Sequence, residues 1–221
     1  MDVIILAGGL GTRIRSVTKN LPKVMIDLNG KPLLEHTFNY LKNFNVQNVI
    51  LAVGYKKEYI KKYFGNQYEN INIIYSEEKE QLGTGGAIKK ALNYTDEENV
   101  IVMNGDLLVN VDLDELYRCH INQENEVEST LTIKKMQDYE RYGTIVEEDG
   151  FIKKFKEKEY TKEGFINVGI YVINKSKFIS ENPEKIFSIE KDYFEKITKI
   201  KKLYTYKYSG EFLDVGIPED Y

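Results

Sequence analysis

The sequence contains a single cysteine, Cys119, no tryptophan, and only four prolines and two histidines in 221 residues. One cysteine excludes an intramolecular disulfide framework and a zinc site built from several cysteines. No run of 18 apolar residues occurs, so the sequence predicts no membrane-spanning helix. The first apolar residues run into glycines with no basic segment before them, so we expect no signal peptide and a cytoplasmic location.

An excess of positive charge is also missing. The chain has 31 Lys and Arg against 35 Asp and Glu, a net charge of −4, which argues against nucleic acid as a partner. Disorder is excluded by 42% hydrophobic residues, among them 17 Tyr and 10 Phe. The length predicts one domain, 1–221.

The first half, 1–125, alternates short apolar runs with helix-like patterns. Such alternation is typical of βαβ units, so we expect an α/β fold with a Rossmann-like, mostly parallel but mixed sheet and helices on both faces. The expected strands are 3–6, 48–53, 71–75 and 100–103, and the expected helices are 33–44, 56–64, 86–92 and 113–121.

The second half, 126–221, is rich in strands. Asp149-Gly150 lies between two apolar runs and predicts a β-hairpin. The expected strands are 129–135, 143–147, 151–155, 165–173 and 202–208, with one helix at 189–197. In such a sheet a ligand site is expected at the carboxyl ends of the parallel strands.

A glycine-rich loop follows the first strand directly, with the sequence Leu6-Ala7-Gly8-Gly9-Leu10-Gly11-Thr12-Arg13. Glycines let the backbone approach a ligand closely, and successive free N–H groups can hold a phosphate. The loop fits neither the P-loop nor the dinucleotide fingerprint. Two of the four arginines, Arg13 and Arg15, lie in it, and arginine suits phosphate recognition.

Four further blocks follow in order, and together with the loop they carry a resemblance. They are Leu82-Gly83-Thr84-Gly85-Gly86-Ala87, Asn104-Gly105-Asp106, Phe155-Lys156-Glu157-Lys158 and Asp214-Val215-Gly216. With Pro22-Lys23 and Gly30-Lys31-Pro32, the whole chain resembles the sugar-1-phosphate nucleotidyltransferases. The resemblance implies a GT-A-like nucleotidyltransferase fold with a nucleotide-binding half, 1–125, and a sugar-phosphate-binding half, 126–221.

The reaction of that family joins a nucleoside triphosphate to a sugar 1-phosphate and releases pyrophosphate. The attacking phosphate oxygen is ionised at neutral pH, so the chemistry needs positioning and charge neutralisation rather than a general base. This agrees with His36 and His120, which both lie in helical patterns that we interpret as structural. The resemblance implies that Arg13 holds the β- and γ-phosphates and that Lys23 contacts the α-phosphate and the incoming phosphate.

Charge neutralisation implies a divalent metal, Mg²⁺ or alternatively Mn²⁺. Asp106 follows a predicted strand and a Gly break, which places it at a carboxyl strand end. The resemblance implies that Asp106 and Asp214 are the metal ligands and that Arg13, Lys23 and Asp106 are the catalytic set. Asp112 and Asp114 precede a predicted helix, where capping is the simpler interpretation.

The resemblance also assigns the two substrate pockets. The sugar phosphate is expected at Gly143, Glu157, Lys158 and Asn167. The nucleotide is expected at Leu6, Ala7, Gly8, Gly9, Gly11, Thr12, Arg13, Glu78, Gln81, Gly83, Thr84, Asn104 and Gly105.

Glu78 is a candidate reader of the base. Guanine presents two adjacent donors, which one carboxylate can accept, whereas uracil and thymine present one donor flanked by acceptors that a carboxylate repels. Glu78 therefore favours GTP. Glu80 is a second possible reader, and Gln81 could reach the base and select UTP or dTTP.

Within the family, 53–60 and 82–88 look most like the D-glycero-α-D-manno-heptose 1-phosphate guanylyltransferases, which implies GTP and that heptose phosphate as substrates. UTP- or dTTP-dependent transfer to glucose 1-phosphate and GTP-dependent transfer to mannose 1-phosphate are alternatives, and a nucleotide-sugar glycosyltransferase is a remote one. Relatives are commonly dimers, which implies a possible homodimer. The ending 218–221 resembles the start of a helix, so we expect that the native chain could continue further.

Overall fold

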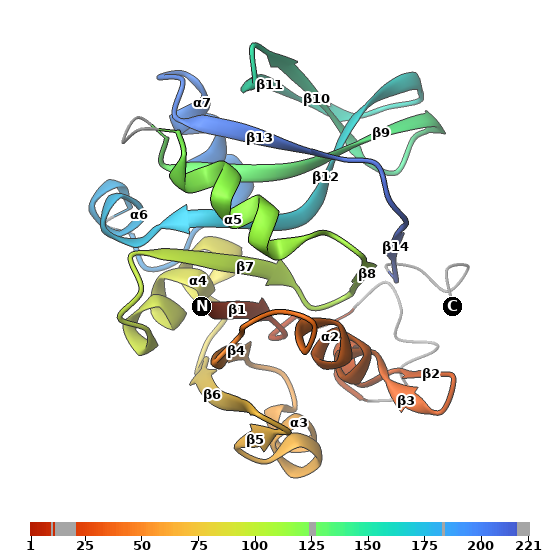
Figure 1. The fold of residues 1–221 in the computed structure, drawn as a ribbon, viewed down its shortest axis with the longest axis vertical. Helices are drawn as coiled ribbons and strands as arrows, with labels where there is room; N and C mark the ends of the chain where they lie inside the picture. The colour runs from red at the N-terminus through yellow and green to blue at the C-terminus, as the bar shows by residue number, and fades with distance from the viewer. Residues whose placement is uncertain (10, 12–20, 124–126, 183, 216–221) are drawn as a thin grey trace.

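One ten-stranded sheet organises the computed structural model, which describes residues 1–9, 11, 21–123, 127–182 and 184–215. The strand order is β10-β11-β13-β9-β12-β7-β1-β4-β6-β5 (Figure 1). The mixed α/β sheet agrees with the prediction.

The parallel part of the sheet lies in the first half of the chain. Strand β1 (Asp2–Leu6) is central, between β7 (Asn99–Asn104) on one side and β4 (Asn48–Val53) and β6 (Ile71–Glu77) on the other. Strands β1, β4 and β7 are apolar along almost their whole length because both faces of a parallel sheet are covered. The remaining elements of this half are α2 (Leu33–Leu41), α3 (Lys57–Phe64), edge strand β5 (Gln67–Tyr68), α4 (Gly83–Ala91), η3 (Leu92–Tyr94) and α5 (Leu113–Ile121).

The second half extends the sheet with mainly antiparallel strands. Strand β12 (Thr161–Asn174) pairs with β9 (Ser129–Tyr139) along its length and with β7 at its end, so it joins the two halves. The predicted hairpin is confirmed between β10 (Gly143–Glu148) and β11 (Phe151–Lys158), where Asp149 and Gly150 have φ of 53° and 82°. The other elements are α6 (Lys175–Glu181), η4 (Ile189–Phe194), α7 (Glu195–Thr198) and β13 (Leu203–Tyr208).

Four helix predictions differ from the structure in their bounds. The helix expected at 56–64 begins at Lys57, because Lys56 is the N-cap and has a left-handed φ of 50°. The helix expected at 33–44 ends at Leu41 because the N–H groups of Asn43 and Phe44 bond three residues back, which tightens the last turn. The helix expected at 86–92 begins at Gly83. The helix expected at 189–197 is a π-helical turn, η4, followed by the short α7.

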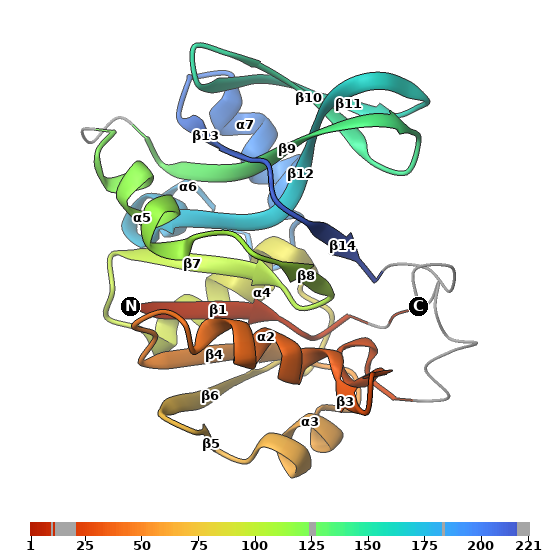
Figure 2. The ribbon, with the colours of Figure 1, turned by 45° about the vertical axis from the view of Figure 1, so that its right-hand side comes forward.

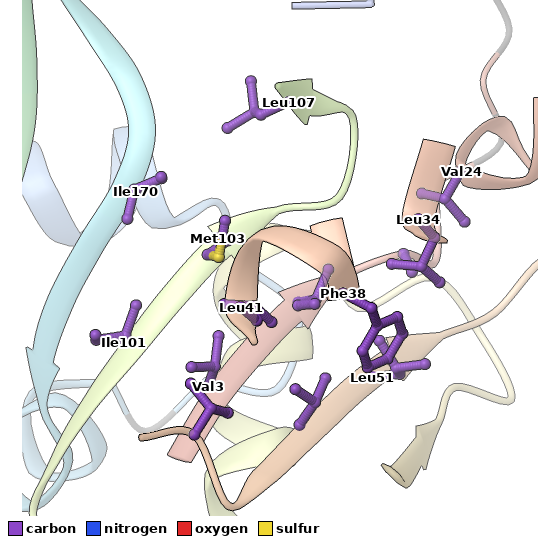
Figure 3. Close-up of a cluster of buried hydrophobic side chains, with 14 of the residues drawn as sticks. Val3, Val24, Leu34, Phe38, Leu41, Leu51, Ile101, Met103, Leu107 and Ile170 are labelled. Carbon is purple, nitrogen blue, oxygen red and sulfur yellow. The ribbon is translucent and has the colours of Figure 1, made fainter. Parts of the chain in front are cut away.

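The core consists of one apolar layer on each face of the sheet. Val3 and Ile5 point to one layer and Ile4 to the other, as alternation along a strand requires. In the first layer, Phe38 and Leu41 of α2 pack over β1, β4 and β7 (Figure 3). In the second, Tyr171 of β12 packs edge-on against Phe194. No helix within the described residues is long and apolar enough to cross a membrane.

Two small two-stranded sheets lie at the end of the molecule where the parallel strands terminate. Strand β2 (Asp27–Leu28) pairs with β3 (Lys31–Pro32), after the short 3₁₀ turn η2 (Lys23–Met25). Strand β8 (Leu107–Val109) pairs antiparallel with β14 (Phe212–Asp214), and the two ribbons run side by side in both views (Figures 1 and 2). The second pair brings the last described strand back to the carboxyl end of β7.

Candidate functional site

Two adjoining cavities open at the carboxyl ends of the parallel strands. The smaller has a volume of about 460 Å³ and lies between the loop after β1 and the start of α4. The larger, of about 760 Å³, lies between β8, β14 and the β10–β11 hairpin. Asn104, Asp106 and Glu190 line both cavities. A group bound at these three residues would therefore contact ligands in both.

Asp106 is the centre of the charged part of the site. It follows β7 at the predicted strand end, and its carboxylate forms an ion pair with the Lys23 ammonium. The two side chains are 29% and 15% exposed, so the pair is largely shielded from bulk water. Lys23 holds this position because it begins η2 directly after Pro22.

Backbone pairing between β8 and β14 places Asp214 next to Asp106. In the β8–β14 pair it is registered with Leu107, the residue after Asp106, and the Val215 N–H donates to the Asp106 carbonyl at 3.0 Å. The larger cavity is lined by both aspartates. Asp106 lies in the turn between β7 and β8, and Asp214 is the last residue of β14. Two carboxylates that line one cavity with room for phosphate oxygens are a donor set that Mg²⁺ accepts. The described residues contain no cluster of three or more His, Cys, Asp or Glu side chains suited to a metal.

The glycine-rich loop contributes its first part to the smaller cavity. Leu6, Gly8 and Gly9 line it, whereas Ala7 is buried and donates its N–H to Ala52 at 2.8 Å. Gly11 has φ of 55°, a left-handed conformation that suits glycine. Thr12 and Arg13, predicted to bind the triphosphate, lie outside the described residues, as does Arg15.

Gly105 is predicted to bind the nucleotide, but in the structure it packs against the backbone of Leu6. Its N–H donates to the Leu6 carbonyl at 3.0 Å, and a Cβ at this position would lie 2.6 Å from the same oxygen. It is absent from the lining of both cavities. The close approach fixes the turn that carries Asp106.

Glu78 lies against the glycine loop. A Cβ on Gly8 would come within 2.7 Å of Glu78 Oε1, and the Leu82 N–H donates to Oε2 at 3.2 Å. Burial raises the pKa of this carboxyl group, while the bond from Leu82 and the charge of Lys90 oppose that rise. Gln81 lines the same cavity. Glu80 does not; it pairs with Lys185 on the outside.

The glycines of the 83–86 block are needed for packing against a distant segment. The N–H groups of Gly85 and Gly86 both point to the Phe187 carbonyl, at 3.0 and 3.4 Å, and Phe187 N–H donates back to Leu82 at 3.1 Å. A Cβ at Gly85 would lie 2.2 Å from the Phe187 ring. The 185–190 segment thus lies directly on the start of α4. Gly83 and Thr84 also line the smaller cavity, as predicted.

We predict that Gly85→Ala destabilises the protein by about 1–3 kcal/mol, because the new methyl group overlaps a ring in a packed site. Urea or thermal unfolding followed by circular dichroism measures the change. Adding Phe187→Leu, which frees space at the ring edge, should recover part of the loss, as expected for two residues in contact. Equal stability of Gly85→Ala and the wild type would contradict the packing argument.

The predicted sugar-phosphate residues all line the larger cavity: Gly143, Glu157, Lys158 and Asn167. Gly143 lies at a register shift between β10 and β11, where a Cβ would be 2.8 Å from the Lys156 carbonyl. Asn167 Oδ1 accepts from the Gly169 N–H at 2.7 Å, which leaves its amide donors available to the cavity.

Several residues that line the larger cavity are not among those predicted from the sequence, and one set of them lies between residues 188 and 195. Glu190 and Lys191 line the larger cavity from η4, Ser188 lines it as the N-cap of η4, and Glu195 lines it as the first residue of α7. Their segment was expected to be an ordinary helix, and its polar residues were given no role. What marks these residues as candidates is the π-helical turn, because such turns are frequent at functional sites. A pattern with a period of 3.6 residues cannot distinguish this turn from an α-helix.

The two histidines are structural, as interpreted from the sequence. His120 is buried and contacts Thr130 Oγ1 at 2.9 Å and Asn99 Oδ1 at 3.1 Å. Burial lowers its pKa to about 4. His36 Nε2 lies 2.8 Å from the Leu28 carbonyl. Neither residue lines the two cavities.

Known proteins resemble this chain over its whole length. The nucleotidyl transferase family model matches residues 2–221. The D-glycero-α-D-manno-heptose 1-phosphate guanylyltransferase of Aneurinibacillus thermoaerophilus is 48% identical over 221 residues, with 100% of this chain and 95% of the relative covered. The enzyme of the same name from Campylobacter jejuni is 44% identical, with coverage of 100% and 97%.

A solved structure has the same architecture. HddC from Yersinia pseudotuberculosis superposes with a TM-score of 0.86 at 37% identity, over 100% of this chain and 96% of that one. A second structure of HddC, complexed with GMP-PN, gives a TM-score of 0.85 at 36% identity and covers 99% and 95% of the two chains.

Proposed function

Since the chain belongs to the nucleotidyl transferase family, we propose that it transfers a guanylyl group from GTP to D-glycero-α-D-manno-heptose 1-phosphate and releases pyrophosphate. Two relatives that carry this activity in their names are 48% and 44% identical over the full chain. The observation that carries the proposal is the meeting of the two cavities at Asp106, which is paired with Lys23 and adjacent in register to Asp214.

The smaller cavity would take GTP and the larger the sugar 1-phosphate. The sugar phosphate oxygen attacks the α-phosphorus, the bond to the β-phosphate oxygen breaks, and pyrophosphate leaves. The nucleophile is already ionised, so the protein supplies position and charge rather than a base. Lys23 would hold the α-phosphate beside Asp106, and Arg13 would hold the β- and γ-phosphates.

Asp106 and Asp214 would hold the metal of this site. The two carboxylates lie on adjacent strand ends and line the same cavity, which fits a Mg²⁺ ion that completes its shell with phosphate oxygens and water; Mn²⁺ has similar preferences. When bound, the ion supplies positive charge to the transferring phosphoryl group. Lys23 adds a second positive charge at the same phosphate.

Glu78 would read the base. Its carboxylate lies at the wall formed by Gly8 and Leu82, inside the smaller cavity. In its ionised form it accepts hydrogen bonds from both guanine donors. Leu6, Gly9, Gly83, Thr84 and Asn104 line the rest of this cavity. Gln81 in the same lining is the observation that favours UTP or dTTP as the alternative nucleotide.

In the larger cavity, Glu157 and Asn167 would bind sugar hydroxyl groups and Lys158 the sugar phosphate. Gly143 would let the sugar approach the β10 backbone. In this proposal, residues of 1–125 mainly bind the nucleotide and residues of 126–221 mainly bind the sugar phosphate. Asn104 and Asp106 contribute to both cavities, as expected for residues where the reaction occurs.

The test is a pyrophosphate-release assay with Mg²⁺ that crosses GTP, UTP, dTTP, CTP and ATP with the 1-phosphates of D-glycero-α-D-manno-heptose, mannose and glucose. We expect turnover with GTP and the heptose phosphate. If mannose 1-phosphate is the only sugar phosphate that reacts with GTP, the proposed sugar is wrong and the proposed nucleotide stands. Turnover with UTP or dTTP and glucose 1-phosphate would refute the role of Glu78. No pyrophosphate from any pair would refute the proposal.

A further inference from the structure

Glu190 lies at the boundary of the two cavities, in the π-helical turn η4. It is one of three residues that line both cavities, and the other two, Asn104 and Asp106, belong to the strand end that carries the proposed chemistry. Burial raises the pKa of Tyr171 strongly, and the charges of Glu190 and Asp106 add to the rise.

The Glu190 carboxylate is held from one side. Its Oε2 accepts hydrogen bonds from Thr84 Oγ1 at 3.1 Å and from Ser188 Oγ at 2.9 Å. Thr84 Oγ1 accepts in turn from the Ile189 N–H at 2.9 Å, which fixes the direction of its proton. The backbone around Ser188 is held as well, because its N–H donates to Asp192 Oδ2 at 2.7 Å.

The second carboxylate oxygen, Oε1, has no hydrogen-bond partner among the described residues. A fixed carboxylate with one oxygen unused can accept a hydrogen bond from a hydroxyl group. It would repel a phosphate group, because both are negative. The chemistry of a ligand group at this oxygen is thus a hydroxyl, either of a sugar 1-phosphate or of the nucleotide ribose.

The residues around Glu190 favour a hydroxyl group of the sugar 1-phosphate over one of the ribose. Lys191 of η4 and the two residues that flank η4, Ser188 and Glu195, line only the larger cavity, whereas Glu190 lines both cavities. We propose that Glu190 is a specificity-determining residue that accepts a hydrogen bond from a hydroxyl group of the sugar 1-phosphate through Oε1. Thr84 is then a positioning residue, which couples the start of α4 beside the nucleotide to the sugar pocket.

This inference rests on the proposed function, and the experiment separates the two. The variants are Glu190→Ala, which removes the acceptor, and Glu190→Gln, which keeps the shape and an amide oxygen. The matched control is Asp192→Asn, which removes a charge from the same turn, keeps an oxygen that can accept from the Ser188 N–H, and lines neither cavity. Thermal melting checks that each variant is folded.

Steady-state kinetics with GTP and the heptose 1-phosphate, and with its monodeoxy forms, gives the main readout. For Glu190→Ala we expect a 10- to 100-fold rise in KM for the sugar phosphate, as for the loss of one charge-assisted hydrogen bond, and less than a threefold change in KM for GTP. Glu190→Gln should lie between Ala and the wild type, and Asp192→Asn should match the wild type.

The deoxy series identifies the hydroxyl that is read. For one monodeoxy sugar phosphate, the wild-type kcat/KM should be at least 10-fold lower than for the complete sugar phosphate. With Glu190→Ala the same comparison should differ by no more than twofold, because the partner of that hydroxyl is already gone. Equal losses in both proteins overturn the proposal. The proposal is also overturned if Glu190→Ala raises KM for GTP but not for the sugar phosphate, and if the two proteins have the same KM for 2′- or 3′-deoxy-GTP. That result would assign Glu190 to a ribose hydroxyl.

Calorimetric titration of the sugar 1-phosphate into each protein gives a readout that does not need turnover. Weaker binding by Glu190→Ala at unchanged melting temperature supports the inference. A wild-type protein that binds no sugar 1-phosphate overturns the inference and the proposed function together. Normal turnover and binding in Glu190→Ala overturns the inference alone.

Discussion

Asp106→Asn is expected to lower kcat by about 10³-fold, because it removes a charged metal ligand next to the transferring phosphate. The substitution keeps the shape of the side chain and its place beneath Lys23. The backbone bond from the Val215 N–H to the residue 106 carbonyl does not depend on the side chain, so the β8–β14 pair should persist. We expect KM for both substrates to change much less than kcat, since most binding contacts are elsewhere in the cavities.

Pyrophosphate release over a Mg²⁺ titration measures this effect. If Asp106 is a metal ligand, the variant should need a higher Mg²⁺ concentration for half its maximal rate, and Asp214→Asn should behave in the same way. Asp112→Asn is the matched control: Asp112 accepts from the Glu115 N–H at 2.9 Å and caps α5, so it should affect stability slightly and turnover less than twofold. Retention of more than a tenth of wild-type kcat in Asp106→Asn would refute its role.

The parallel half of the fold was predictable from local patterns. Strand β1 and its neighbour β4 each begin with a polar residue, Asp2 or Asn48, and are apolar from there to the end of the strand. Such runs are typical of strands that are covered on both faces. The position of Asp106 follows from the same logic, because a residue directly after β7 must lie at the carboxyl edge of the sheet.

The position of Asp214 could not be derived from local patterns. It depends on an antiparallel pair between β8 and β14, two three-residue strands from opposite ends of the chain. Strands this short carry almost no periodicity, so only the family resemblance placed the two aspartates together. The structure supplies the physical reason, which is the register of Asp214 with Leu107.

The glycines of the 83–86 block illustrate a different limit. The resemblance implies that Gly83 and Thr84 bind the nucleotide, and both line the smaller cavity. Gly85 is glycine because the Phe187 ring occupies the space of its Cβ, a contact between residues far apart in sequence. Glu190 was missed for the same reason, since its two hydrogen bonds depend on how this segment lies on α4.

Glu78→Gln is expected to lower kcat/KM for GTP by about 100-fold and to raise kcat/KM for UTP or dTTP at least tenfold. The carboxylate accepts from both guanine donors, whereas an amide places its own N–H₂ against one of them. Two hydrogen bonds to a charged group contribute roughly 3 kcal/mol, which corresponds to about a 100-fold change. Uracil and thymine present acceptors that the new amide donors can meet.

The pH dependence of the wild type gives an independent check of the same residue. Burial raises the pKa of the Glu78 carboxyl group, so on lowering the pH it takes up a proton earlier than an exposed glutamate does. Guanine reading requires the ionised form, and a proton on the carboxyl group replaces one of its acceptor sites by a donor. KM for GTP should therefore rise as pH falls through that raised pKa, and Glu78→Gln should lack this rise.

Glu80→Gln is the matched control for both measurements. Its carboxylate pairs with Lys185 outside the smaller cavity and is 56% exposed, so its replacement should change the selectivity between GTP and UTP less than twofold. A switch of nucleotide in Glu80→Gln together with none in Glu78→Gln would move base reading to the outer acidic residue. If neither variant changes the preference but Gln81→Ala does, the amide reads the base, and the argument from guanine's paired donors is wrong for this chain.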